Sequence, residues 1–159
     1  MEIRPIQANN NKAIAVLIRS VFIDMGVPKK GTAYEDKELD NMYETYLGER
    51  SVYYLVLDEN KILGGAGISP LKDEATSVCE LQKMYFSPKI RGKGLGFKVI
   101  QKCLNFAKIN EFTLCYIETT PIMHAAQRLY KKVGFNYIAK PLGNTGHSSC
   151  SIWMTKSLI

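Results

Sequence analysis

Residues 84–96 have the residue types and spacing best suited to binding chemistry in this sequence. An apolar, strand-like stretch ends at Pro88, and a basic loop with three alternate glycines leads into an amphipathic run to Ala107. The start of a helix exposes unpaired backbone N–H groups and the positive end of the helix dipole. Glycines let a ligand approach the backbone, and Arg91 and Lys93 add positive charge. The stretch therefore predicts a phosphate or pyrophosphate site, the alternative being a glycine-rich turn that only reverses the chain.

Two common phosphate motifs do not fit this loop. Counting from Gly92, the Walker pattern would require Gly-Lys-Ser/Thr where the chain has Phe97-Lys98-Val99. The dinucleotide pattern would require a glycine at Phe97, three residues after Gly94. The loop instead reads Arg-x-x-Gly-x-Gly from Arg91 to Gly96, which resembles the acetyl-CoA signature of the GCN5-related N-acetyltransferases (GNAT).

The elements that must position this loop follow from hydrophobic periodicity. Apolar residues spaced three and four apart predict helices, and alternating or wholly apolar runs bounded by turn residues predict strands. The predicted helices span residues 14–26, 39–48, 95–107 and 126–134, and the predicted strands span residues 2–6, 52–57, 62–69, 76–86, 112–119, 135–139 and 150–155. Glycines 64, 65 and 67 indicate a bulge or a close backbone approach inside their strand. In strand 76–86, strict alternation would put Glu80, Gln82, Met84 and Phe86 on one face.

A second segment strengthens the resemblance. Residues 129–135, Leu-Tyr-Lys-Lys-Val-Gly-Phe, look like the Leu-Tyr-x-x-x-Gly-Phe element of the same family. The order of elements also matches, so the resemblance covers nearly the whole chain. It implies an α/β (α+β) fold in a single domain, residues 1–159, with a mixed, mostly antiparallel sheet of about seven strands flanked by about four helices.

The resemblance also implies roles for particular residues. Acetyl-CoA would be the co-substrate, with its pantetheine arm on the backbone of Met84, Tyr85 and Phe86. Its pyrophosphate would lie on the loop from Arg91 through Gly92, Lys93, Gly94 and Leu95 to Gly96. Tyr130 would lie near the thioester sulfur. Many members carry a cofactor-contacting asparagine before this tyrosine, whereas this chain reads Pro121-Ile122-Met123-His124, so that contact is not assigned.

The expected activity is transfer of an acetyl group to a primary amine of a small molecule or peptide, by direct attack in a ternary complex. A lysine-like amine, with a pKa near 10.4, must lose a proton before it attacks. Glu80 is the candidate base, directly or through a water, or else a partner in a structural salt bridge. Tyr130 is the candidate acid, or else an aromatic residue packed in the core. The alternative function is a catalytically weak acyl-CoA-binding or sensing module.

The acceptor is not identified by the sequence. Residues 26–48 and 141–149 are expected to shape its pocket, with Tyr34 and His147 as candidate contacts and plain packing or solvation as the alternative. Cys150 lies three residues from His147, which is weak support for covalent catalysis because a reactive thiolate needs a base partner.

Composition sets the remaining expectations. The net charge of +6 is spread along the chain except around the glycine loop, so a polyanionic cofactor is favoured over nucleic acid. The apolar runs are shorter than a membrane helix requires, and a cytoplasmic location without membrane association is expected. Four scattered cysteines and two histidines favour buried free thiols and no metal site. A homodimer is an expectation from the family alone.

Overall fold

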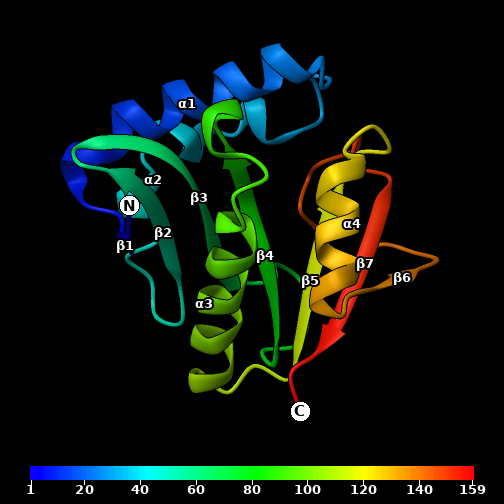
Figure 1. Cartoon of the computed structure of the whole chain (residues 1–159). Coiled ribbons are helices and arrows are strands. Elements are labelled where there is room, and N and C mark those ends of the chain that lie inside the picture. The colour runs from blue at the N-terminus through cyan, green and yellow to red at the C-terminus, as the bar shows by residue number, and fades with distance from the viewer.

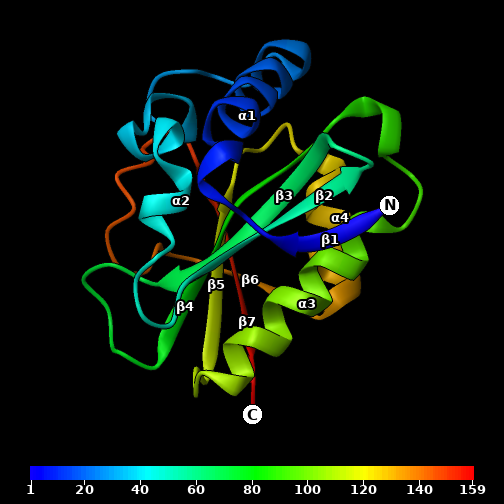
Figure 2. The same cartoon turned by 90° about the vertical axis from the view of Figure 1, so that its left-hand side faces the viewer.

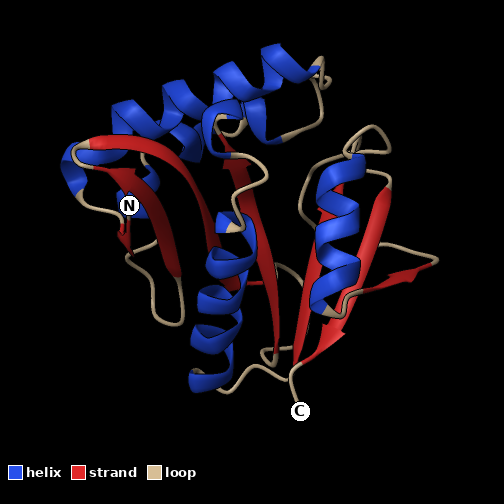
Figure 3. Ribbon diagram, in the orientation of Figure 1, coloured by secondary structure: helices blue, strands red, loops and turns tan.

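The computed structural model describes residues 1–159, and its centre is one seven-stranded sheet in the order β1-β2-β3-β4-β5-β7-β6 (Figures 1 and 3). Only β4 and β5 pair in parallel, and α3 connects them. The strands are β1 (Glu2–Pro5), β2 (Val52–Asp58), β3 (Lys61–Pro70), β4 (Val78–Phe86), β5 (Leu114–Thr119), β6 (Asn136–Ile138) and β7 (Ile152–Ser157). The helices are α1 (Asn11–Met25), α2 (Met42–Thr45), α3 (Leu95–Ile109) and α4 (His124–Val133). The predicted fold class is confirmed.

Helices cover both faces of the sheet (Figure 2). On one face, α1 and the segment around α2 bury a core that includes Ile14, Phe22, Leu39 and Tyr53. On the other, α3 and α4 bury a larger core that includes Val99 and Tyr130. Burying an apolar face on each side of a sheet is what its mixed architecture requires. No helix is both long enough and apolar enough to cross a lipid bilayer.

The predicted second helix is the least accurate of the sequence-based elements. Residues 33–45 form two short 3₁₀ turns, Ala33–Glu35 and Lys37–Asp40, and then the single turn of α2. Asn41, at φ −133°, breaks the helix between them. The apolar side chains of Leu39 and Met42 are nevertheless fully buried. Packing against α1 therefore holds the segment in place without the continuous helical hydrogen bonds that the prediction implied.

A bulge in β4 overturns the predicted alternation of its side chains. Lys83 has a left-handed φ of 48°, and the register with β3 shifts between Gly65 and Gly67. One extra residue reverses the face of everything after it. Met84 and Phe86 therefore pack on the α3 face, whereas Glu80 faces the opposite side of the sheet. The Tyr53 hydroxyl stabilises the bulge by donating a hydrogen bond of 2.8 Å to the Lys83 carbonyl.

The glycines of β3 make room for aromatic rings, as the sequence suggested. A Cβ on Gly65 would overlap the ring of Tyr53, and a Cβ on Gly67 would overlap the ring of Tyr46. These contacts keep the bulged part of the sheet tightly packed on the α1 side.

Candidate active site

β4 and β5 separate at the level of Glu80. Their parallel pairing runs from Val78 with Leu114 to Glu80 with Tyr116 and ends there, and the strands diverge beyond it (Figure 1). Ser87 directly follows β4, and its amide donates a hydrogen bond to the carbonyl of Leu63 in β3. Backbone groups alternate in direction along a strand, so Tyr85 also directs its N–H and C=O groups toward β3. Met84 and Phe86 consequently direct their backbone N–H and C=O groups to the opposite edge of β4, where β5 is no longer paired with it. An extended ligand can add to this edge like a further strand.

The larger cavity, of about 370 Å³, lies along this open edge. All but one of the sequence-predicted cofactor residues line it: Met84, Tyr85, Phe86, Arg91, Gly92, Gly94, Leu95 and Gly96. The exception is Lys93, whose side chain is exposed to solvent. Tyr130, Leu129 and Met123 close the cavity from the side of α4.

The glycine loop offers an unusual density of free hydrogen-bond donors. None of the backbone N–H groups from Gly92 to Phe97 donates to an acceptor within the protein. Gly92 and Gly94 have φ values of 76° and 73°, and a Cβ at either would meet nothing within 4 Å. A run of free amides at the start of the long helix α3 fits an anionic phosphate group. The loop is therefore suited to the pyrophosphate of a coenzyme A thioester.

Arg91 was expected to add positive charge to the phosphate site, but its guanidinium group binds the protein backbone. Its Nε and Nη2 donate hydrogen bonds of 3.1 and 3.0 Å to the Phe86 carbonyl. These bonds tie the loop to the end of β4, and so Arg91 helps to fix the loop's conformation.

A second, smaller cavity of about 40 Å³ adjoins the first on the far side of the β4–β5 opening. Met84, Tyr85, Met123 and Tyr130 line both. Its polar lining comes from Thr32, Lys83, Glu118, Thr119, Thr120 and Cys150. The enclosed volume is roughly that of a few water molecules, so it suits the end of a ligand and not a whole one.

Tyr130 lies where the two cavities meet. Its side chain is 3% exposed, and its hydroxyl makes no hydrogen bond within the protein. Burial raises the pKa of this hydroxyl, so the group keeps its proton at neutral pH. Thr120 is the second polar group available to a ligand here: its Oγ1 is the one buried side-chain polar atom without a hydrogen-bond partner.

Glu80 is buried beneath this site and lines neither cavity. Gln82 donates a hydrogen bond of 2.6 Å to its carboxylate, and the Tyr46 hydroxyl donates to Gln82. Burial raises the pKa of Glu80 to about 7, the Gln82 hydrogen bond opposes this rise, and the negative charge of Glu118 adds to it. A pKa near 7 suits a group that takes up and releases protons at neutral pH.

The two predicted acceptor contacts lie beside the cavities and not in their walls. The ring of Tyr34 packs edge-on against Phe22, with the centroids 5.8 Å apart. His147 Nε2 lies 2.9 and 3.1 Å from the two carboxylate oxygens of Asp36, which also binds the Lys83 ammonium at 3.1 Å.

This ionic group joins the loop before β7 to the bulge of β4. Burial would raise the pKa of Asp36, but the hydrogen bond with His147 and the charge of Lys83 outweigh it and lower that pKa. Burial would lower the pKa of His147, and Asp36 raises it overall.

Sequence reasoning missed Asp36, Lys83, Glu118 and Thr120. Glu118 had a usable signal, because it is an acidic residue that directly follows the apolar run Leu114–Ile117. Asp36 and Lys83 had none, since a bulge and a folded loop bring them together.

Comparison with known proteins gives a consistent picture. The sequence profile described as "Acetyltransferase (GNAT) family" matches residues 20–135. The chain is 40% identical over 156 residues to the uncharacterized N-acetyltransferase YjgM of Escherichia coli K12, covering 98% of this chain and 93% of that protein. A GNAT-family acetyltransferase from Staphylococcus aureus Mu50 superposes with a TM-score of 0.86 at 19% identity, covering 99% of both chains. A phosphinothricin acetyltransferase from Sinorhizobium meliloti, solved with acetyl-CoA, gives 0.79 at 18% identity, covering 98% of this chain and 87% of that one.

Proposed function

Because the chain belongs to the acetyltransferase (GNAT) family, we propose that it transfers the acetyl group of acetyl-CoA to a primary amine of a small molecule or peptide. The amine would attack the thioester directly, with both substrates bound. The observation that carries this proposal is the meeting of two cavities at Tyr130, one along the glycine loop and one beside Glu118.

The residues of the larger cavity suit acetyl-CoA, which supplies an acetyl group activated as a thioester. The free amides from Gly92 to Gly96 would hold its pyrophosphate. The outward backbone groups of Met84 and the N–H of Phe86 would bind its pantetheine arm, since the Phe86 carbonyl already accepts from Arg91. Bound in this way, the coenzyme would fill the opening between β4 and β5.

The smaller cavity suits the amino end of the acceptor. Glu118, in its wall, attracts a protonated amine, and the unpartnered hydroxyl of Thr120 offers a hydrogen bond. The cavity has a volume of about 40 Å³, so the amino group and its nearest atoms would occupy it and the rest of the acceptor would extend outward. This size favours an unbranched primary amine.

Two groups are suited to the proton transfers that acyl transfer requires. Glu80, with a pKa of about 7, would accept the proton of the amine through a water, because its carboxylate does not reach the cavity wall. The protonated hydroxyl of Tyr130 would donate a proton to the departing sulfur. Before the next turnover, Glu80 would release its proton to solvent and Tyr130 would take one up from solvent.

The test compares Tyr130→Phe with Tyr137→Phe, whose hydroxyl is exposed and hydrogen-bonded only to Gln127. Coenzyme A release is measured across a panel of amines, and acetyl-CoA binding is measured by thermal shift. We expect Tyr130→Phe to lower kcat about 100-fold with acetyl-CoA binding unchanged, because it removes only a proton transfer. The control should resemble the unmodified protein in both assays.

Two results would contradict the proposal. Equal loss of binding and turnover in Tyr130→Phe would make the tyrosine a structural residue. Tight acetyl-CoA binding with no coenzyme A release for any amine would instead support an acyl-CoA-binding or sensing module.

A further inference from the structure

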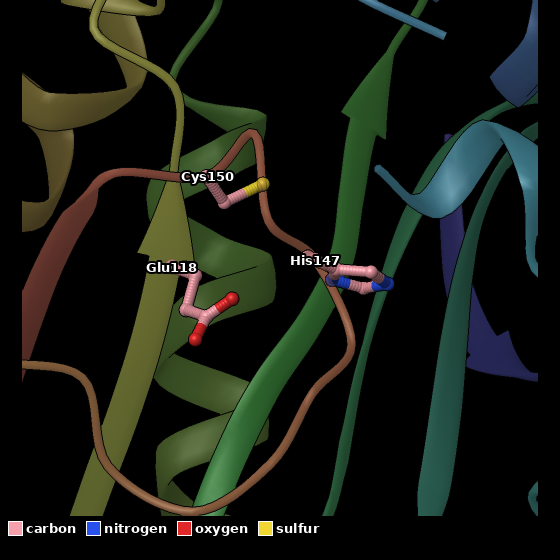
Figure 4. A group of neighbouring side chains, drawn as sticks. All are labelled: Glu118, His147 and Cys150. Carbon is pink, nitrogen blue, oxygen red and sulfur yellow. The ribbon is translucent and has the colours of Figure 1, made fainter. Parts of the chain in front are cut away.

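Three side chains capable of binding a metal ion converge next to the smaller cavity. Glu118 comes from β5, and His147 and Cys150 come from the loop that precedes β7 (Figure 4). One ligand atom from each lies within 4.8 Å of those of the other two. All three side chains are partly buried, and Glu118 and Cys150 line the cavity.

The donor types are those of a zinc site. One thiolate, one imidazole and one carboxylate suit Zn²⁺, whereas Mg²⁺ and Ca²⁺ require a shell of oxygen atoms. Tetrahedral coordination at the usual metal–ligand lengths sets the donor atoms roughly 3.4–3.7 Å apart. Side-chain rotations that move the donor atoms by about 1 Å would therefore bring them from their observed separations to those around a bound ion.

The neighbours of these side chains already hold them in suitable orientations. Asp36 binds His147 through Nε2, so the other ring nitrogen, Nδ1, remains available on the side toward Cys150 and Glu118 (Figure 4). The carboxylate of Glu118 accepts hydrogen bonds of 2.7 Å from the hydroxyls of Tyr116 and Thr145. A carboxylate on the second nitrogen of a histidine and hydrogen bonds on the ligating carboxylate are typical outer contacts of zinc sites.

The local charge also favours a cation. Glu118 brings one carboxylate to the cluster, and the carboxyl groups of Asp36 and Glu80 act on Cys150 from nearby. Lys83 is the only ammonium bound among them. Because Asp36 is already paired with Lys83 and His147, the charge that a divalent ion would compensate is that of the Glu118 carboxylate.

We propose that Glu118, His147 and Cys150 bind one divalent ion of the Zn²⁺ type, with its fourth coordination position open toward the smaller cavity. On binding, the Cys150 thiol releases its proton to solvent and the metal–sulfur bond forms. The ion would join β5 to the loop before β7, two segments that are far apart in the sequence. No oxidation or reduction is involved. This proposal shares Glu118 and the smaller cavity with the acetyl-transfer proposal, but it can fail separately because each of its readouts is a measurement of metal binding.

The experiment uses the untagged full-length chain after removal of metals with a chelator. Zn²⁺ binding is measured by calorimetry and thermal shift, and Co²⁺ is then substituted as a spectroscopic probe. We expect one ion per chain, release of a proton, a higher melting temperature and a thiolate-to-cobalt charge-transfer absorption. None of these readouts depends on catalysis.

Variants separate this site from other donors. Cys150→Ser and His147→Asn should each weaken Zn²⁺ binding about 100-fold or more, and Asp36→Asn should weaken it about 10-fold through the orientation of His147. His124→Asn, which alters the one other histidine at an exposed position, should bind as the unmodified chain does. Absence of submillimolar binding, or binding that Cys150→Ser and His147→Asn both leave unchanged, would overturn the proposal.

Discussion

Replacing Glu80 with glutamine removes the charge of a buried carboxyl group and keeps its shape. The substituted amide oxygen can still accept the hydrogen bond from Gln82, so the packing around Tyr46 should persist. The groups whose charges act on Glu80 are Glu118, His147 and Lys83, and all remain in the variant. A difference between the two proteins therefore isolates the titration of this one group.

The sign of the effect follows from the raised pKa. The folded state holds the Glu80 proton more tightly than the unfolded state does, so the protonated form stabilises the fold at low pH. That stability is complete below the ordinary pKa of 4.5 and is lost as pH rises toward about 7. With these two pKa values, ionisation of Glu80 destabilises the fold by about 1 kcal/mol at pH 5 and about 3 kcal/mol at pH 8, relative to a group that stays uncharged.

The unmodified protein should therefore lose about 2 kcal/mol more unfolding free energy between pH 5 and pH 8 than Glu80→Gln does. Urea denaturation at each pH measures this difference. Glu38→Gln is the matched control, because Glu38 is exposed and its side chain makes no hydrogen bond. The control should keep the pH dependence of the unmodified protein. Parallel stability curves for Glu80→Gln and the unmodified protein would refute the argument from burial.

The same variant tests the proposed base. In the unmodified enzyme, kcat/KM should fall as pH drops below about 7, because Glu80 must be ionised to accept a proton. Glu80→Gln should lose this limb of the profile together with most of its turnover. An unchanged profile would transfer the role to Glu118, the carboxylate that lines the smaller cavity.

Three further outcomes can be tested in the same assays. Gly94 and Gly146 both have a positive φ, and a Cβ at either would meet no other atom. Gly94→Ala and Gly146→Ala should therefore each lower the free energy of unfolding by about 1 kcal/mol, but only Gly94→Ala should weaken acetyl-CoA binding. Thr120→Val removes the unpartnered buried hydroxyl, so urea denaturation should register a gain of about 1 kcal/mol while KM for the amine rises. Asp36→Asn leaves the buried Lys83 ammonium without its partner and should cost about 3 kcal/mol; a neutral result would mean that water already screens this pair.

The sequence by itself determined the fold class, and it located the glycine loop that lines the larger cavity. The periodicities of α1, α3 and α4, the positions of the strands and the glycine loop are local patterns, and these agreed with the final structure, whereas the alternation of β4 did not. Gly26 and Gly134 end their helices in the left-handed conformation, as glycine readily does. The glycine loop could be predicted because the residues that expose its amides are contiguous in the chain.

Only the tertiary structure decided which residues form the smaller cavity. The bulge at Lys83 reverses the faces of β4, and no residue type at that position announces a left-handed backbone. Asp36 and His147 are 111 residues apart, and Glu118 meets Cys150 only because the loop before β7 folds over β5. Side chains brought together by long-range packing leave no spacing in the sequence, since their separation along the chain is set by the elements between them. For this physical reason, the glycine loop could be located from the sequence and the smaller cavity could not.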